Sequence, residues 1–477
     1  MRNHYSFKHI FGAVLCIVML TLSVSAEAQV RVPFTQRTSQ YTPTKKIYNV
    51  RGDFAMIGNT NMTLQNYSND NPNSNNTMIY VDTDGVGSTF NSSSATLQLS
   101  TENGAVPNCS NIIYAGLYWT GRASDGNNSP DIFTVTKNNV TKTFNKRVVS
   151  IKGPNSPTYT QVTANASDIY YPQNGDGFMY SAYAEVTDYI KNNGLGAYTV
   201  ADIALVEGNG GSTGYYGGWS LIVVYENSKM KYRDVTIFDG HAYVAGNVTA
   251  DFEIPVAGFN TVQAGPVNMK LGLMAGEGDR SINGDFFQIR NAANNNWVNL
   301  SHSGNATNNF FNSSIVTGGN SRTPNLVNNT GLDISVFNIN NPNNSVMTNN
   351  QSSTRFRYGS TQDTYVIFAV AMAVDAYIPD VESTIAITSV NGAPAQTPLQ
   401  SVLPGQDTEL KIQIRNRGTE PINNYKLTVP IPYNAEYVQN SGQRSVFFTP
   451  LPSPNALTFE PTIGSNGSLV WDFGTLP

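Results

Sequence analysis

Three long runs of β-branched and aromatic residues constrain the fold most strongly. They cover residues 112–119, 219–225 and 365–374, and none of them contains a charged side chain. Runs of this length and composition are typical of strands buried on both faces. The chain must therefore cover both sides of at least one sheet.

The rest of the sequence also favours strands and turns. The chain has 58 Asn and 40 Gly, against 28 Lys and Arg together, and it is poor in helix formers. Residues 96–99 and 251–254 alternate polar and apolar side chains, as strands with one wet face do. Only residues 182–192 have a helical pattern. We therefore predict an all-β protein.

The chain divides into a large head and a smaller C-terminal domain. We predict that residues 29–377 form a large, jelly-roll-like β-sandwich. Because about 350 residues is large for one β domain, two packed sandwiches are the alternative. Within the head, residues 291–351 are rich in Asn, Ser, Thr and Gly, which predicts long surface loops on one edge.

Residues 378–477 carry the spacing of an immunoglobulin-like sandwich. Strand signals occur at 384–390, 409–415, 425–429, 445–448 and 469–473. An immunoglobulin-like domain has about seven strands. We therefore expect this domain to be truncated at its C-terminal end, without its last strands.

The first 28 residues predict a signal peptide. Arg2 and Lys8 precede an apolar stretch at 10–24, which is short for a membrane span. Ala26 and Ala28 then form a small-x-small cleavage site, so that Gln29 begins the mature chain. We expect an exported protein without a transmembrane span after cleavage.

Composition excludes several kinds of chemistry. The net charge of −5 and the 13% of charged residues argue against nucleic acid as a partner. After cleavage only Cys109, His241 and His302 remain of the Cys and His residues, too few for a zinc site of those ligands. We expect no cofactor, with calcium as the one alternative, and no enzymatic activity.

Two acidic segments are candidate calcium sites. Asp82 and Asp84 stand in an Asp-Thr-Asp-Gly turn that begins like a calcium loop. Glu277, Asp279 and Asp285 form the densest acidic cluster, with glycines between them. Turn chemistry explains the first segment equally well, and a charged turn near Arg280 explains the second.

Other side chains suggest sugar chemistry. Tyr215, Tyr216 and Trp219 are candidates for stacking on a sugar ring, although aromatics that enter a buried strand are more often core. Glu277 or Glu207, paired with an Asp, is the carboxylate pair that a glycosidase would need. A lectin-like module and a glycosidase are therefore the two alternatives to a non-catalytic surface protein.

Several segments resemble large bacterial surface proteins. The stretch LPGQDTELKIQIRNRGTEPINNYKLTVPIP resembles their conserved repeat domain, with Pro404, Gly405, Asn416, Gly418 and Pro432 on its pattern. The family's Asp before that last Pro is replaced here by Val429 and Pro430. The segment LVWDFGTLP resembles the part that precedes the family's final strands.

The head also resembles the N-terminal region of such proteins. The segments IIYAGLYWTG, YYGGWSLIVVYEN and EGDRSINGD are similar to those of exported proteins in gliding bacteria that use type IX secretion. The resemblance implies a cell-surface or secreted location, an adhesive or structural role, and glycan or protein ligands. It supplies no catalytic residue.

Signal cleavage is directly testable. We expect N-terminal sequencing of the protein from its native host to begin at Gln29, because signal peptidase requires small residues at positions 26 and 28. Ala28→Arg should block cleavage and leave the leader attached. An intact Met1 in the wild-type envelope fraction would contradict the prediction.

Overall fold

The computed structural model describes residues 31–123, 131–172, 178–246, 252–292, 295–376, 381–398, 401–418 and 420–477. The signal peptide and its cleavage residues Ala26, Ala28 and Gln29 lie outside these ranges. The fold is all-β, as predicted, and the described helices are short. Among the described residues, no helix has the length and apolar character needed to cross a membrane.

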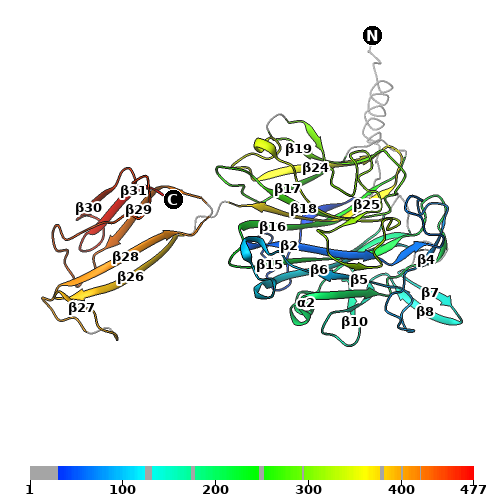
Figure 1. Cartoon of the computed structure of the whole chain (residues 1–477), viewed down its shortest axis with the longest axis horizontal. Helices are drawn as coiled ribbons and strands as arrows, with labels where there is room; N and C mark the ends of the chain where they lie inside the picture. Colours follow the sequence, from blue (N-terminus) through cyan, green and yellow to red (C-terminus); the bar gives the residue numbers. More distant parts are fainter. Residues whose placement is uncertain are drawn as a thin grey trace, which may run out of the picture.

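The head is built as four layers of sheet, which Figure 1 shows stacked from top to bottom. The lowest layer has the order β10 (Thr160–Thr163), β9 (Val148–Lys152), β13 (Gly196–Ala201), β5 (Ser92–Leu97) and β22 (Arg322–Thr323). The uppermost layer has the order β17 (Phe252–Ala257), β24 (Ser353–Ser360), β19 (Asp285–Arg290) and β20 (Trp297–Asn299).

One eleven-stranded sheet supplies both middle layers. Its lower half comprises β11 (Ile169–Tyr170), β12 (Met179–Glu185), β6 (Asn111–Arg122), β15 (Gly217–Glu226) and β2 (Tyr48–Thr60). Its upper half comprises β16 (Tyr232–Val244), β25 (Tyr365–Asp375), β18 (Met269–Gly276), β23 (Leu332–Asn338) and β21 (Ile315–Val316), with β1 (Arg31–Gln36) beside β16. The three charge-free runs of the sequence form β6, β15 and β25, and they are buried almost throughout.

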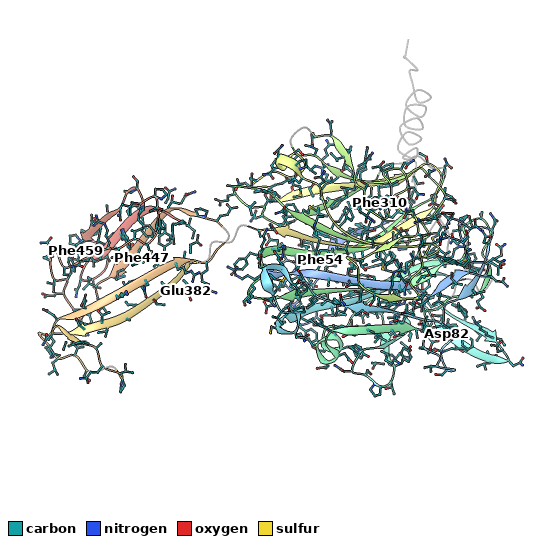
Figure 2. All side chains as sticks on the ribbon, in the orientation of Figure 1. Phe54, Asp82, Phe310, Glu382, Phe447 and Phe459 are labelled. Atoms are coloured by element: carbon teal, nitrogen blue, oxygen red, sulfur yellow. The ribbon has the colours of Figure 1, made fainter. Side chains whose placement is uncertain are left out.

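A hydrophobic core fills each of the three spaces between neighbouring layers. The first lies between the lowest layer and the lower half of the long sheet, and Trp119, Trp219 and Ile151 belong to it. The second lies below the uppermost layer, around Phe287 and Phe356. The third lies between the two halves of the long sheet, and Figure 2 shows its Phe54 in the middle of the head. The head therefore consists of two sandwiches packed against each other.

Short elements complete the head. They are β14 (Gly208–Asn209), β4 (Thr77–Tyr80) and β3 (Met62–Leu64), the hairpin β7 (Ile132–Lys137) and β8 (Val140–Asn145), the 3-10 turns η1 (Glu102–Gly104), η2 (Pro107–Cys109) and η3 (Pro342–Asn344), and α2 (Thr187–Asn193). The helix is real but shorter than the pattern at 182–192 predicted, because β12 continues to Glu185. Cys109 is exposed in η2.

The C-terminal segment forms two three-stranded sheets (Figure 1). One is β27 (Ala393–Pro394), β26 (Val381–Val390) and β28 (Thr408–Asn416), and the other is β29 (Ile422–Pro430), β31 (Ser468–Leu476) and β30 (Ala456–Glu460). The prediction of a strand at 445–448 is wrong: this segment forms no strand, and the Phe447 side chain is 92% exposed. Pro450, Pro452 and Pro454 follow it, and proline cannot donate to a ladder.

The Asn-rich region departs from the prediction of surface loops. Strands β20 to β23 run through it as expected, but Asn309, Ser313 and Asn329 are buried. Their burial follows from hydrogen bonding: the Asn329 side chain donates to the Ser313 carbonyl at 3.0 Å, and the Ser313 hydroxyl donates to the Gly278 carbonyl at 2.6 Å. Polar side chains can enter a protein interior when their partners are supplied in this way.

Close packing of the two sandwiches can be tested at Gly272 on β18. A methyl group there would lie 2.7 Å from the Phe54 ring in the third core. We expect Gly272→Ala to lower the free energy of unfolding by about 1–3 kcal/mol through overpacking, measured by urea denaturation. Gly87→Ala is the matched control, because its methyl group would enter open space. Equal stability of the two variants would contradict the third core.

Candidate functional site

The predicted acidic cluster is buried and bound to backbone amides. Asp285 accepts hydrogen bonds from the amides of Phe310 and Phe311, at 2.8 and 2.9 Å. Asp333 accepts from those of Ser313 and Ser314, at 3.1 and 2.9 Å. Two carboxylates thus clamp one stretch of the Asn-rich region to the sheets, and Figure 2 shows Phe310 in the upper part of the head.

Asp279 and Glu277 have comparable surroundings. Asp279 accepts from the Asn73 amide at 3.1 Å, and its own amide donates to Asp363 at 2.8 Å. Glu277 is buried with a φ of 82°, and its amide donates to the Gly331 carbonyl at 2.6 Å. Burial raises the pKa of Asp279 and of Asp285 to about 7. The carboxylates of Asp279 and Asp285 therefore fix the chain path around them.

Asp82 and Asp84 lie in the turn that the sequence suggested, at the edge of the head (Figure 2). Asp84 accepts hydrogen bonds from the Val86 amide at 2.8 Å, the Thr89 hydroxyl at 3.0 Å and the Tyr159 hydroxyl. Asp82 accepts from the Ser92 hydroxyl at 2.8 Å. These bonds are those of a closed turn. In the part of the chain that the structure describes, no group of three or more His, Cys, Asp or Glu is placed to hold a metal ion.

The predicted stacking residues need correction. Tyr216 and Trp219 are fully buried, and the Trp219 indole donates to the Ser93 hydroxyl at 2.9 Å. They therefore present no ring to a ligand, because they belong to the third and first cores. Tyr215 is partly exposed and lies 5.5 Å from the Arg122 guanidinium.

Glu207, the other proposed glycosidase acid, takes part in local contacts. It accepts from the Tyr80 amide at 2.9 Å and forms an ion pair with Lys137 at 2.9 Å. These two contacts tie the Glu207 carboxylate to β4 and β7.

A polar network lies where the two sandwiches meet near β1. Arg37 forms ion pairs with Asp168 at 2.9 Å and Asp239 at 2.6 Å. Beside it, Ser181 and His241 Nδ1 are 2.8 Å apart. His241 lies inside β16, which continues past a bulge between Asp239 and Ala242 to Val244.

The residues around this network leave almost no space for a substrate. The pocket that Ser181 and Asp239 help to line has a volume of about 10 Å³, which is about the space that one water molecule needs. Burial lowers the pKa of His241 to about 3, which keeps the ring neutral. The network joins β12 in the lower half of the long sheet to β16 in the upper half, and the pocket beside it is too small for a sugar substrate.

The outward face of the uppermost layer is different, and sequence reasoning missed it. We call this the outer face; it comprises Glu253 and Pro255 of β17, Arg355 and Arg357 of β24, Phe286, Gln288 and Arg290 of β19, and Trp297 and Asn299 of β20. All of these side chains are partly or fully exposed. The sequence signal that could have revealed this face is the alternation of buried and exposed residues along β19. Asp285, Phe287 and Ile289 are buried, and the residues between them are partly exposed.

Strand register arranges the outer face in two rows. In the first row Glu253 pairs with Arg357, Arg357 with Gln288, and Gln288 with Asn299. In the second row Pro255 pairs with Arg355, and Arg290 with Trp297. Antiparallel continuation of the β19–β24 ladder by one residue places Arg290 next to Arg355. Three arginines and one tryptophan therefore share one small patch.

Contacts within the outer face hold these side chains in place. Arg290 and Arg357 lie 5.0 and 4.8 Å from the centre of the Trp297 ring. Arg357 Nε donates to Gln288 Oε1 at 2.6 Å, and Gln288 Nε2 donates to Asn299 Oδ1 at 2.6 Å. Stacking and hydrogen bonding of this kind orient a guanidinium for recognition of an anion.

Comparisons with known proteins leave the family open. No family model matches the chain, and no curated protein matches it. Solved structures with some likeness include PNGase F, a glycosylasparaginase from Flavobacterium meningosepticum, at 12% identity over 67% of this chain and 95% of that one, with a TM-score of 0.18. Another is the major capsid protein P2 from bacteriophage PM2, at 11% identity over 67% and 97%, with a TM-score of 0.17. TM-scores this low establish neither a shared fold nor a shared activity.

The buried carboxylates predict an unusual pH dependence. The pKa of Asp285 is about 7 in the folded state and near the ordinary aspartate value of 3.8 in the unfolded state. Between these values the folded chain binds a proton that the unfolded chain does not, so this residue's contribution to stability grows as pH falls. Asp285→Asn also loses acceptor capacity toward two amides, which costs about 1–3 kcal/mol.

We therefore expect Asp285→Asn to destabilise the protein more at pH 5.5 than at pH 8, measured by urea denaturation. Because His241 and the other titrating groups are present in both proteins, their effects cancel in the comparison. Asp70→Asn, at an exposed carboxylate, is the matched control and should change little at either pH. A loss that is larger at pH 8 would contradict the raised pKa.

Proposed function

We propose that the protein is an exported, non-catalytic cell-surface protein with an adhesive or structural role. In this proposal residues 29–377 are the head, which binds through its outer face, and residues 378–477 are an immunoglobulin-like domain of the stalk that carries it. The leader sequence and the resemblance to surface proteins of gliding bacteria support the location.

One observation carries the non-catalytic part: three buried carboxylates are used to hold backbone amides. Asp279, Asp285 and Asp333 are buried, and each accepts hydrogen bonds from amides of the polypeptide. A glycosidase needs two carboxyl groups that flank a substrate bond. Buried acids that clamp loops instead stabilise a rigid scaffold, which suits binding by an exposed surface.

The location and the role can be tested together in the native host. We expect a membrane-impermeant biotin reagent to label the protein on intact cells, and deletion of the gene to reduce attachment of cells to a polysaccharide-coated surface. Leu15→Arg, which interrupts the apolar leader, should abolish labelling and fail to restore attachment. The wild-type gene is the control for restoration.

Two outcomes would contradict the proposal. One is retention of the wild-type protein inside the cell. The other is release of reducing sugar from a glycan panel by the purified mature protein, with loss of that activity in Glu277→Gln or Glu207→Gln. The second result would favour the glycosidase alternative.

A further inference from the structure

We propose that the outer face binds an anionic oligosaccharide, a sugar chain carrying carboxylate or sulfate groups. This inference rests on the proposed binding role and names the class of ligand. It is carried by three features of the outer face: its charge, its chemistry and its rigidity.

The outer face is positive on a negative protein. Its named residues include Arg290, Arg355 and Arg357 but only one acid, Glu253, which gives the patch a net charge of +2. The chain as a whole has a net charge of −5. Arg355 forms an ion pair with Glu253 at 3.1 Å, and Arg290 Nε donates to Asn295 Oδ1 at 2.9 Å. The excess positive charge that an anionic ligand would meet therefore lies on Arg290 and Arg357.

The side chains of the outer face match the parts of such a ligand. Guanidinium groups bind carboxylate or sulfate through paired hydrogen bonds, more specifically than lysine does. The amides of Gln288 and Asn299 can donate to and accept from sugar hydroxyls. Trp297 and Phe286 add apolar ring surface, and Phe286 lies 5.7 Å from the Arg357 guanidinium. Charged, polar and aromatic groups thus lie together on four neighbouring strands.

The outer face is held by the core beneath it. Phe287, Ile289 and Phe356, which alternate with the outward residues, are fully buried in the second core. The four strands span about 14 Å at the usual strand spacing, and the outward side chains on them are partly or fully exposed. A rigid binding surface loses little entropy when ligand binds, and its openness suits a chain molecule that lies across the strands.

Charge also argues for a sugar chain over nucleic acid, which arginine and aromatic residues bind as well. Nucleic-acid-binding domains carry an extended basic stripe and a high pI. Here the sequence pI is about 5.4 and the positive patch is confined to three arginines. We therefore assign the ligand to the oligosaccharides.

The test measures binding of the purified mature protein to four probes by isothermal titration calorimetry. The probes are a heparin-derived sulfated oligosaccharide, an oligogalacturonate, a neutral cello-oligosaccharide and single-stranded poly-dT. We expect one or both acidic sugars to bind, more weakly as salt is added, and the neutral sugar and poly-dT not to bind. The two acidic probes distinguish sulfate from carboxylate recognition.

Variants assign the binding to the outer face. We expect Arg290→Gln with Arg355→Gln to weaken binding about tenfold or more, as loss of charge-assisted hydrogen bonds does, and Trp297→Ala to weaken it as well. Lys411→Gln with Arg415→Gln removes the same charge from the C-terminal sheet and should leave affinity unchanged. Arg355→Gln alone, at a side chain 62% exposed, provides a variant with little structural cost, and urea denaturation checks the folding of each protein.

Three results would overturn the inference: no binding of either acidic sugar, equal binding by the outer-face variants and the wild type, or tighter binding of poly-dT. If the cells still display the protein and need it for attachment, such a result removes only the ligand assignment. Failure of labelling and attachment in the host would instead remove the proposed function.

Discussion

Four residue pairs join the two halves of the long sheet, and the arrangement of the head depends on them. Strands β2 and β16 each contain 13 residues but pair only through Tyr48–Arg51 and Tyr232–Val235. Beyond this short seam the strands separate, so that the two halves of the sheet turn to face each other. One continuous sheet can then enclose the third core and still present its outer sides to two further layers.

Charged side chains lie in the interior near the seam and at the other end of the head. Lys270 and Arg37 each form an ion pair with a carboxylate. Lys270 of β18 reaches Asp53 of β2 at 2.6 Å, which ties the upper half of the sheet to the lower half. At the far end Arg37 joins Asp168 and Asp239. Burial lowers the pKa of Lys270, and the adjacent Asp53 opposes this shift. Removing one partner of such a pair is costly because the other charge stays buried.

Sequence reasoning found the parts of this fold that depend on local pattern. The charge-free runs are β6, β15 and β25, and the alternation at 384–390 and 409–415 lies within β26 and β28. Sequence reasoning failed where residues far apart in the sequence determine whether a segment forms a strand or a side chain is buried. Phe447 stands in a segment that looks like a strand but has no ladder partner in the described chain, whereas polar Asn329 is buried because Ser313, 16 residues away, supplies an acceptor.

At the candidate site, too, local sequence pattern alone does not show which side chains are exposed. Tyr216 and Trp219 look like a stacking platform when read along the chain, but the layers on either side enclose them. The outer face becomes visible only when β19, β20 and β24 are aligned, because Arg290, Trp297 and Arg355 come from three separate segments. Asp285 connects the two kinds of site. As the first residue of β19, it is fixed from within by the amides of Phe310 and Phe311, and Phe286, Gln288 and Arg290 follow it outward. A buried acid thereby sets the position of one of the two central strands of the exposed surface.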